Sequence, residues 1–390
     1  MKKKGLVLIV LTCFVLGMTL AGCGTSSQKA GQQGQEPEGI KIGVFEPMTG
    51  EKASGGQMTV EGIKLANKLY PEVLGKKVEL VIVDNKSDKT EAKNAVTRLI
   101  EKDKVNAIIG SYGSGLSMAA GPTVKAAKVP AVGCSPTNPL VTQGNEYYFR
   151  VCFIDPFQGT VMAKYAVNTE KAKTAVIITN IADDYSVGLS NYFEQAFKKL
   201  TGNEKSVLAK LEYQTGSQDF TAQLATVKKV KPDVVFAPGN YGDVALLIKQ
   251  ARELGIKTPF LGGDTLEAPE FIEVGGQAVE GVAFSTHYSA QAPATGASKD
   301  FVDAYKKEYN KEPNAFAALG YDAYMVILDA IKRANSADPV KIRDALANTK
   351  NFNGATGIIT IDEERNANKS AVILKVQNGK FVYVTTVQPD

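Results

Sequence analysis

The segment IIGSYGSGLSMAAG, residues 108–121, changes character twice. An apolar run stops at Gly110, glycines and small hydroxyl residues follow as far as Gly115, and a run of small and apolar residues then begins. The order strand, glycine-rich turn and helix places free backbone N–H groups at the start of a helix, where they can bind an anion. The segment therefore predicts an α/β fold and raises the question of which anion the turn holds.

The same order of strand, loop and helix repeats on both sides of this segment. Segments with helical periodicity lie between the apolar runs, such as TVEGIKLANKLY (59–70) and YGDVALLIKQARELG (241–255). Strands that alternate with helices at this spacing form a parallel sheet with helices on both faces. The expected strands, some with their following loops, lie at residues 39–50, 77–88, 105–110 and 129–139 in the first half, and at 174–180, 206–214, 232–239, 258–263 and 280–288 in the second.

Two such halves predict two doubly wound parallel-sheet lobes, with a hairpin near the C-terminus that turns at Asn378-Gly379. Ligands bind beyond the carboxyl ends of parallel strands, so the facing loops should form a cleft that closes on a small molecule. The expected lobes are residues 39–156 with 288–356 and residues 157–287 with 357–390, and the chain should cross between them near 154–158, 285–288 and 355–359.

Composition excludes several classes of function. The chain has 390 residues, enough for two lobes, and its net charge of +4 is too small to indicate nucleic-acid binding. It has one histidine, His287, which nearly excludes a metal site built on imidazoles and leaves one position for histidine-based catalysis. His287 has no partner visible in the sequence and is expected to be structural.

The N-terminus has the pattern of a targeting segment. The basic MKKK precedes a short apolar stretch that ends in LAGC, which resembles the bacterial lipobox. The resemblance implies removal of residues 1–22 as a lipoprotein signal peptide and a diacylglyceryl group on Cys23, although an ordinary secretory signal with an incidental cysteine is the alternative. Residues 23–38 have almost no apolar side chains and should form a disordered tether. The folded body would then work outside the cytoplasm, held near a membrane.

The glycine turn lacks the spacing of three known motifs. No lysine follows Gly115 as in a P-loop, and the glycines do not fit GxGxxG. A nucleophile elbow needs glycines two residues before and two residues after the serine, where Ser114 has Tyr112 and Leu116. Glycines present only for tight packing are one interpretation. The other is that Ser114 at the helix start, with Ser135 and Thr137 after the next strand, offers uncharged donors that suit a carboxylate better than a phosphate.

Several motifs in a fixed order give a family resemblance. After the lipobox come IGVFEPMTG, VDNKSD, IIGSYGSG, VPAVGCSPTNP, YYFRVCFIDPFQG, DDYSVG, LGGD and GYDA. In this order they resemble the leucine/isoleucine/valine-binding family of extracellular solute receptors of ABC transporters, from about Gly39 to the C-terminus. The resemblance implies the periplasmic-binding-protein type I fold, a free amino acid as ligand and an ABC permease as partner. It implies no cofactor, no metal, no enzymatic activity and a monomer.

The resemblance also implies which residues hold the ligand. The ligand carboxylate would bind the hydroxyls of Ser114 and Thr137 and backbone N–H groups of the loop that contains Pro136. The ammonium would bind the carbonyl of Ser135 and the carboxylate of Asp264, because an amino acid zwitterion needs a partner for each buried charge. The side chain would be walled by Tyr185, Tyr241 and Phe316.

Two positions depart from the family pattern. The family often has a glutamate where Asp264 stands. The side chain of Asp264 is shorter, so it must lie nearer the ligand ammonium or contact it through a water molecule. It often has an aromatic residue where Gly55 stands, so we expect an enlarged pocket that admits a larger or more polar amino acid than the branched-chain ones.

The residues alone leave alternatives open. Tyr185 could pack on its own lobe, Asp264 could cap a helix, and Phe316 could be a core residue. Cys134 and Cys152 lie near predicted strand ends in a compartment that permits oxidation, so a disulfide is a possible pairing and two free buried thiols are the alternative. A ligand-sensing module for a signalling partner, or a surface hydrolase that uses Ser114, are the competing functions.

Overall fold

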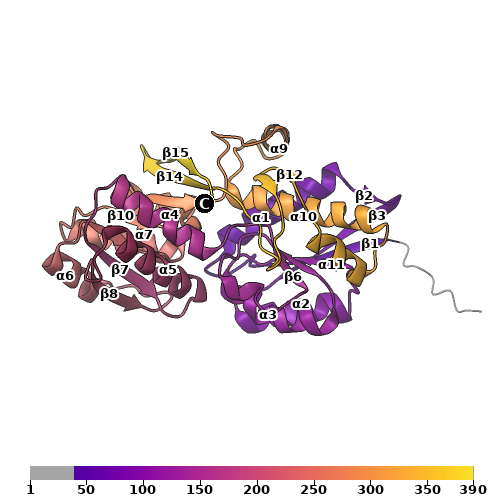
Figure 1. The fold of residues 1–390 in the computed structure, drawn as a ribbon, viewed down its shortest axis with the longest axis horizontal. Coiled ribbons are helices and arrows are strands. Elements are labelled where there is room, and N and C mark those ends of the chain that lie inside the picture. The colour runs from indigo at the N-terminus through magenta and orange to yellow at the C-terminus, as the bar shows by residue number, and fades with distance from the viewer. Residues whose placement is uncertain (1–38, 390) are drawn as a thin grey trace, which may run out of the picture. The chain divides into compact units, whose positions relative to one another are not determined.

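The computed structural model describes residues 39–389. They form two α/β lobes, each built on its own sheet (Figure 1). This confirms the predicted fold class. The expected signal peptide, tether and lipidation at Cys23 lie outside the described residues. In the described part of the chain, no helix is long and apolar enough to cross a bilayer.

The first lobe contains a six-stranded sheet with the order β2-β3-β1-β4-β5-β6. Its strands are parallel except for the short β2, which forms an antiparallel pair with β3. The central position of β1 brings its carboxyl end beside that of β4, where the glycine turn starts. The strand bounds are β1 Ile40–Glu46, β2 Glu72–Val73, β3 Lys76–Asp84, β4 Ala107–Ile109, β5 Ala131–Gly133 and β6 Tyr148–Arg150.

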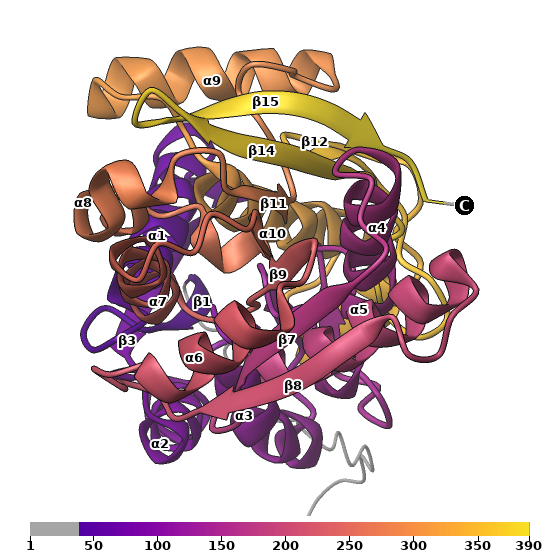
Figure 2. The ribbon, with the colours of Figure 1, turned by 90° about the vertical axis from the view of Figure 1, so that its left-hand side faces the viewer.

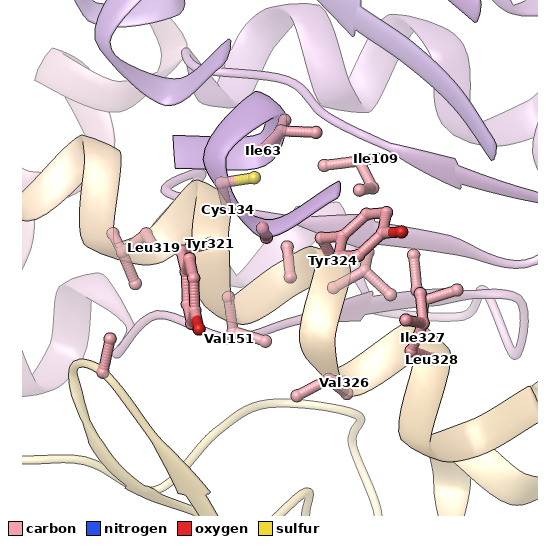
Figure 3. Close-up of a cluster of buried hydrophobic side chains, with 14 of the residues drawn as sticks. Ile63, Ile109, Cys134, Val151, Leu319, Tyr321, Tyr324, Val326, Ile327 and Leu328 are labelled. Carbon is pink, nitrogen blue, oxygen red and sulfur yellow. The ribbon is translucent and has the colours of Figure 1, made fainter. Parts of the chain in front are cut away.

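Helices cover both faces of this sheet. Successive side chains of β1 point to opposite faces and apolar ones lie on each, so both faces are buried beneath helices. Val44 belongs to the core beneath α1 and α10, whereas Phe45 belongs to the core beneath α2 and α3. The first of these cores is shown in Figure 3. A Cβ on Gly62 of α1 would lie 1.8 Å from the carbonyl oxygen of Ala317 in α10, so only glycine allows the two helices to approach so closely. The helices of this lobe are α1 Ala53–Leu69, α2 Lys89–Glu101, α3 Ser114–Ala127, α9 Gly296–Tyr309, α10 Ala315–Ala334 and α11 Pro339–Ala347, with the 3₁₀ turn η1 Pro139–Val141.

The second lobe contains a seven-stranded sheet with the order β15-β14-β11-β10-β9-β7-β8 (Figure 2). The strands from β8 to β11 are parallel, and β14 and β15 extend the sheet in antiparallel fashion. Asn378 and Gly379 join β14 to β15 with φ of 53° and 68°, so the predicted hairpin turn is confirmed. The bounds are β7 Ala175–Asn180, β8 Val207–Tyr213, β9 Val234–Phe236, β10 Phe260–Gly262, β11 Ala283–Thr286, β14 Ala371–Gln377 and β15 Lys380–Val387.

Helices also cover both faces of the second sheet. The core on one face contains Leu189 and Phe193 of α5 with Met162 of α4, and the core on the other contains Leu247 of α7 and Phe271 of α8. The bounds are α4 Asp155–Asn168, α5 Asp184–Thr201, α6 Thr221–Val230, α7 Tyr241–Glu253 and α8 Pro269–Gly275, with the 3₁₀ turns η2 Asp264–Leu266 and η3 Gly276–Val279.

The third connection between the lobes lies later in the chain than expected. The two-stranded ribbon of β12 (Phe352–Gly354) and β13 (Gly357–Ile359) belongs to the first lobe, because Ile359, Ile361 and Ala367 join its core. The Arg150 N–H also donates to the carbonyl of Arg365. The chain therefore enters the second sheet only between Ala367 and the start of β14, and the expected crossing at 355–359 is wrong.

The possible disulfide is also wrong, because Cys134 and Cys152 are both free and buried. Gly133 pairs with Arg150 and accepts from the Val151 N–H, so the ladder places Cys134 opposite Val151 rather than Cys152. Burial raises the pKa of the Cys152 thiol to about 12, against the nearby charge of Arg150, so the thiolate that would start disulfide exchange is disfavoured.

Candidate functional site

A small cavity lies where the carboxyl ends of strands from both sheets face each other. About 300 Å³ of space not filled by atoms lies within it, part of which is open to solvent. The residues that line it follow β1, β4 and β5 in the first lobe and β7, β9 and β10 in the second, as expected for loops beyond the carboxyl ends of parallel strands. The first lobe contributes Lys52, Tyr112, Gly113, Ser114 and Ser135, and the second contributes Asp183, Tyr185, Asn240, Asp264 and Thr265.

The glycine turn is held from below by buried polar groups. Gly110 and Gly113 have φ of 136° and 91°, which side-chain-bearing residues rarely adopt. The Tyr112 N–H donates to Oε2 of Glu46 at 2.6 Å, and the Tyr148 hydroxyl donates to the carbonyl of Gly110 at 2.6 Å. Burial raises the pKa of Glu46 to about 8, opposed by the Tyr112 N–H, so this carboxyl group is mostly protonated at neutral pH.

Ser114 is the first residue of α3 and makes one end of the cavity suited to an anion. The residue before it, Gly113, offers no capping side chain, so the start of the helix lacks the side-chain acceptor that usually satisfies its N–H groups. The Ser114 hydroxyl accepts from the Asn138 N–H at 3.1 Å, which leaves its own proton for another acceptor. The hydroxyl proton, the N–H groups and the helix dipole together favour a small anion here.

Asp264 places a buried carboxylate in the same cavity. Its Oδ1 accepts from Nε2 of Gln158 and from the Tyr185 hydroxyl, both at 2.8 Å, and its Oδ2 lies 3.1 Å from Nε2 of His287. A carboxylate accepts about four hydrogen bonds, so one site remains for a further donor. The side chain of Asp264 does not cap a helix, so the capping alternative does not hold.

His287 therefore has a partner, contrary to the expectation from the sequence. Its ring stacks on Phe153 with 3.9 Å between the ring centroids, and its Nε2 faces Asp264. Burial lowers the pKa of His287, although Asp264 opposes this, so the imidazole is neutral at pH 7. Asp264 consequently has no cation to neutralise it in this contact.

The structure brings only some of the predicted site residues to the cavity. Ser114, Ser135, Tyr185 and Asp264 line it. The others lie just behind this lining. Thr137 is buried two residues after Ser135, and its hydroxyl faces the buried carboxyl group of Asp155.

The remaining predicted residues make protein contacts instead. The carbonyl of Pro136 accepts from Nη1 of Arg150 at 2.6 Å. The hydroxyl of Tyr241 accepts from the Ser54 N–H at 3.2 Å, across the two lobes. Phe316 is fully buried and packs edge-to-face on Tyr112 with 5.0 Å between the ring centroids.

Tyr112 fills the space that Gly55 was expected to leave open. A Cβ on Gly55 would lie 2.3 Å from Cε2 of Tyr112, so the ring lies against the glycine backbone. The expectation of an enlarged pocket is therefore wrong, because an aromatic ring from the glycine turn occupies the position of the missing side chain. Gly55 is required here because the Tyr112 ring leaves no room for a larger residue.

Sequence reasoning did not name six of the cavity residues, which are Lys52, Tyr112, Gly113, Asp183, Asn240 and Thr265. A signal existed for most of them, because they lie in the loops after strands that were expected to face the cleft. Nothing in the pattern separated them from their neighbours, since the contact depends on how the two lobes face each other.

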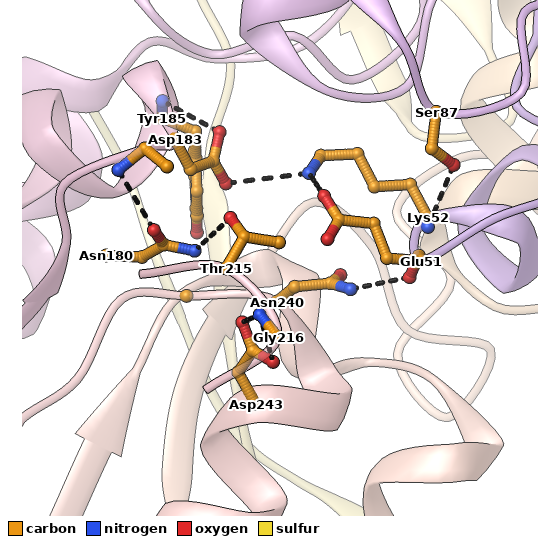
Figure 4. A network of polar contacts seen from close by, with 12 residues as sticks. Glu51, Lys52, Ser87, Asn180, Asp183, Tyr185, Thr215, Gly216, Asn240 and Asp243 are labelled. Atoms are coloured by element: carbon orange, nitrogen blue, oxygen red, sulfur yellow. Dashed lines mark hydrogen bonds and ion pairs between the residues drawn. The ribbon is translucent and has the colours of Figure 1, made fainter. Parts of the chain in front are cut away.

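Polar contacts join the lobes at the edge of the cavity (Figure 4). Nζ of Lys52 lies 2.5 Å from Glu51 and 3.9 Å from Asp183 in the other lobe, and Nδ2 of Asn240 donates to the carbonyl of Glu51 at 2.6 Å. Burial alone would lower the pKa of Lys52, but the carboxylates of Asp183 and Glu51 outweigh it and raise the pKa, so the ammonium stays charged.

Further contacts between the lobes lie around this edge. Lys89 pairs with Asp184 at 2.6 Å, and the Ser54 hydroxyl donates to Glu270 at 2.7 Å. Segments of both lobes are therefore in direct contact on this side of the cavity. In the described part of the chain, no group of histidine, cysteine and acidic side chains could hold a metal ion.

Comparison with known proteins gives consistent matches over the folded body. A family model described as periplasmic binding protein matches residues 39–380. The structure is similar to a leucine binding protein from Thermotoga maritima, with 48% identity, a TM-score of 0.87 and coverage of 90% of this chain and 99% of that chain.

Two further proteins show the same likeness. The isoleucine complex of a branched-chain amino acid transporter substrate binding protein from Streptococcus pneumoniae has 33% identity, a TM-score of 0.84 and coverage of 90% and 100%. A leucine-, isoleucine-, valine-, threonine- and alanine-binding protein from Pseudomonas aeruginosa is 28% identical over 352 residues, which cover 89% of this chain and 90% of that protein.

Proposed function

The chain belongs to the periplasmic binding protein family that includes the leucine/isoleucine/valine-binding proteins, and from this premise we propose that it is an extracytoplasmic receptor for a free amino acid. It closes on the ligand and delivers it to an ABC permease. The observation that carries the proposal is one cavity with an anion-binding helix start at Ser114 and a buried carboxylate, Asp264, from the opposite lobe.

These two groups are complementary to an amino acid zwitterion. The ligand carboxylate binds the Ser114 hydroxyl and the first N–H groups of α3, and the hydroxyls of Ser135 and Thr137 lie on the adjacent loop. The ligand ammonium takes the remaining acceptor site of Asp264. Each buried charge then has an opposite partner, which is the condition for burying either of them.

The position of the two groups also couples binding to closure. Ser114 and Asp264 belong to different lobes, so a zwitterion that bridges them stabilises the closed form over the open one. The closed form presents to a permease a surface assembled from both lobes, which the open form does not. This gives the permease a physical basis to distinguish loaded receptor from empty receptor.

We further propose that the chain is a monomer without enzymatic activity and that a lipid on Cys23 holds it at the outer face of the membrane. The Ser114 hydroxyl accepts from a backbone N–H, and His287 is bonded to Asp264, so neither is arranged as a nucleophile with its base. A Cys23→Ser variant should lose its membrane attachment, and membrane attachment that persists in this variant would contradict the anchor.

A thermal-shift screen with the common free amino acids tests the receptor function. A ligand that binds only the folded protein raises its unfolding midpoint in a concentration-dependent way. We expect at least one free amino acid to do so, with a dissociation constant that calorimetry can measure. If no amino acid raises the midpoint and a peptide or ester is hydrolysed instead, the hydrolase alternative replaces the proposal.

A further inference from the structure

Besides Ser114 and Asp264, the wall of the cavity is polar. Of the residues that line the cavity, none is leucine, isoleucine, valine, methionine, alanine or phenylalanine. Lys52, Asp183 and Asn240 lie in this wall together with the ring of Tyr112 (Figure 4 shows the first three). An aliphatic ligand side chain would therefore find few aliphatic partners here and would remove polar groups from water without replacing their hydrogen bonds.

Two buried polar atoms of this wall have no partner within the described residues. The hydroxyl of Tyr112 and Oδ1 of Asn240 are both buried and unbonded, and the two residues are 2% and 6% exposed. The amide orientation of Asn240 is fixed, because its Nδ2 donates to the Glu51 carbonyl, which can only accept. The wall therefore offers one unused donor, the phenol O–H, and one unused acceptor, the amide oxygen.

We propose that the ligand is an amino acid with a short, neutral, polar side chain, a carboxamide or hydroxyl, which bonds the Tyr112 hydroxyl and Oδ1 of Asn240. The proposal rests on the function proposed above and specifies its ligand class. A carboxamide or hydroxyl both accepts and donates, so one such side chain is complementary to an unused donor and an unused acceptor.

Charged side chains fit the same wall less well. A ligand carboxylate offers no proton to Oδ1 of Asn240 and would lie near Asp183, which lines the same cavity. A ligand ammonium would lie near Lys52, whose charge is already balanced by Glu51 and Asp183. Neutral polar side chains avoid both repulsions. The similar proteins above are named for mostly aliphatic amino acids, so a polar ligand would distinguish this chain from them.

The test uses pairs of ligands that match in size and differ in polarity. Asparagine against leucine, and threonine against valine, are titrated calorimetrically into the full chain. A site built to hydrogen-bond a polar group rejects the analogue that lacks it, so we expect asparagine to bind at least about ten-fold more tightly than leucine, and threonine more tightly than valine. Tyr112→Phe should lower the affinity for asparagine about three- to ten-fold and leave that for leucine within about two-fold.

Tyr213→Phe is the matched control. The Tyr213 hydroxyl is also buried and unpartnered, but Tyr213 does not line the cavity, so this variant should keep the ligand preference of the unchanged protein. Tighter binding of the aliphatic member in either pair, or a preference that Tyr112→Phe leaves unchanged, would overturn the inference while the receptor function stands. Binding of no free amino acid at all would overturn both.

Discussion

Replacing Asp264 by asparagine should abolish most of the affinity for the ligand without unfolding the protein. The side chain is 2% exposed and lines the cavity, and in the proposed complex its carboxylate faces the ligand ammonium. Removing one partner of a buried ion pair costs about 3–5 kcal/mol, because the other charge remains buried without compensation. This corresponds to a loss in affinity of roughly 100-fold to several thousand-fold.

The free protein should tolerate the change. Oδ1 of the new asparagine can still accept from Gln158 and Tyr185, and its amide group can donate to the neutral imidazole of His287 if that ring changes tautomer. Burial lowers the pKa of His287, so the native Asp264 carboxylate has no cationic partner in this contact. The unfolding free energy of Asp264→Asn without ligand should therefore be equal to that of the unchanged protein or higher. Calorimetric titration and urea denaturation measure the two effects separately.

Two other variants give the controls. Asp243→Asn changes an acid at the start of α7 that accepts from the Gly216 N–H and does not line the cavity, so the affinity should stay within about two-fold. Tyr185→Phe removes one hydrogen bond to Asp264 but no charge, and should cost only about 0.5–1.5 kcal/mol. If Asp264→Asn is folded and binds within about five-fold of the unchanged protein, the ammonium is held elsewhere.

Three further variants test separate parts of the account. The carboxyl group of Glu46 has a pKa of about 8 in the folded protein and about 4.5 in the unfolded chain, so the folded state loses stability as the pH rises from 5 to 8. Glu46→Gln should flatten this decline when unfolding free energy is measured by urea denaturation. The gain in stability of the variant should approach roughly 5 kcal/mol above pH 8. Gly55→Ala forces the Tyr112 ring to move, and thermal unfolding should show a loss of about 1–3 kcal/mol. Lys89→Ala removes a largely exposed pair with Asp184, so ligand affinity in low salt should fall only a few-fold, equivalent to less than about 1 kcal/mol.

The sequence was sufficient for the parts of the site that follow from strand ends. Ser114 and Ser135 were predicted because they lie in loops after predicted strands, and the carboxyl ends of parallel strands converge. The same position favoured the cleft for Tyr185, whereas the role of Asp264 came from the family resemblance. These positions depend on local periodicity and on the topology of a parallel sheet, and both can be read from one chain.

Other features depend on packing between distant segments, which periodicity does not encode. The ring of Tyr112 lies against Gly55 because α1 and the glycine turn meet in space. The apolar and polar residues of β12 and β13 would follow the same pattern in either lobe. The pattern therefore could not show where the chain makes its third connection between the lobes. The stagger between Cys134 and Cys152 likewise depends on the register of β5 and β6, and a shift of one residue would change it.

The central claim is that the cavity holds the two charges of a free amino acid, and calorimetry with modified ligands tests it most directly. The best amino acid from the screen is compared with its α-amide, which lacks the carboxylate, and its N-acetyl derivative, which lacks the ammonium. Each derivative leaves one end of the site without its charged partner, so we predict at least about 100-fold weaker binding of both. If the amide binds as tightly as the free acid, the turn at Ser114 does not hold a carboxylate and the account is contradicted.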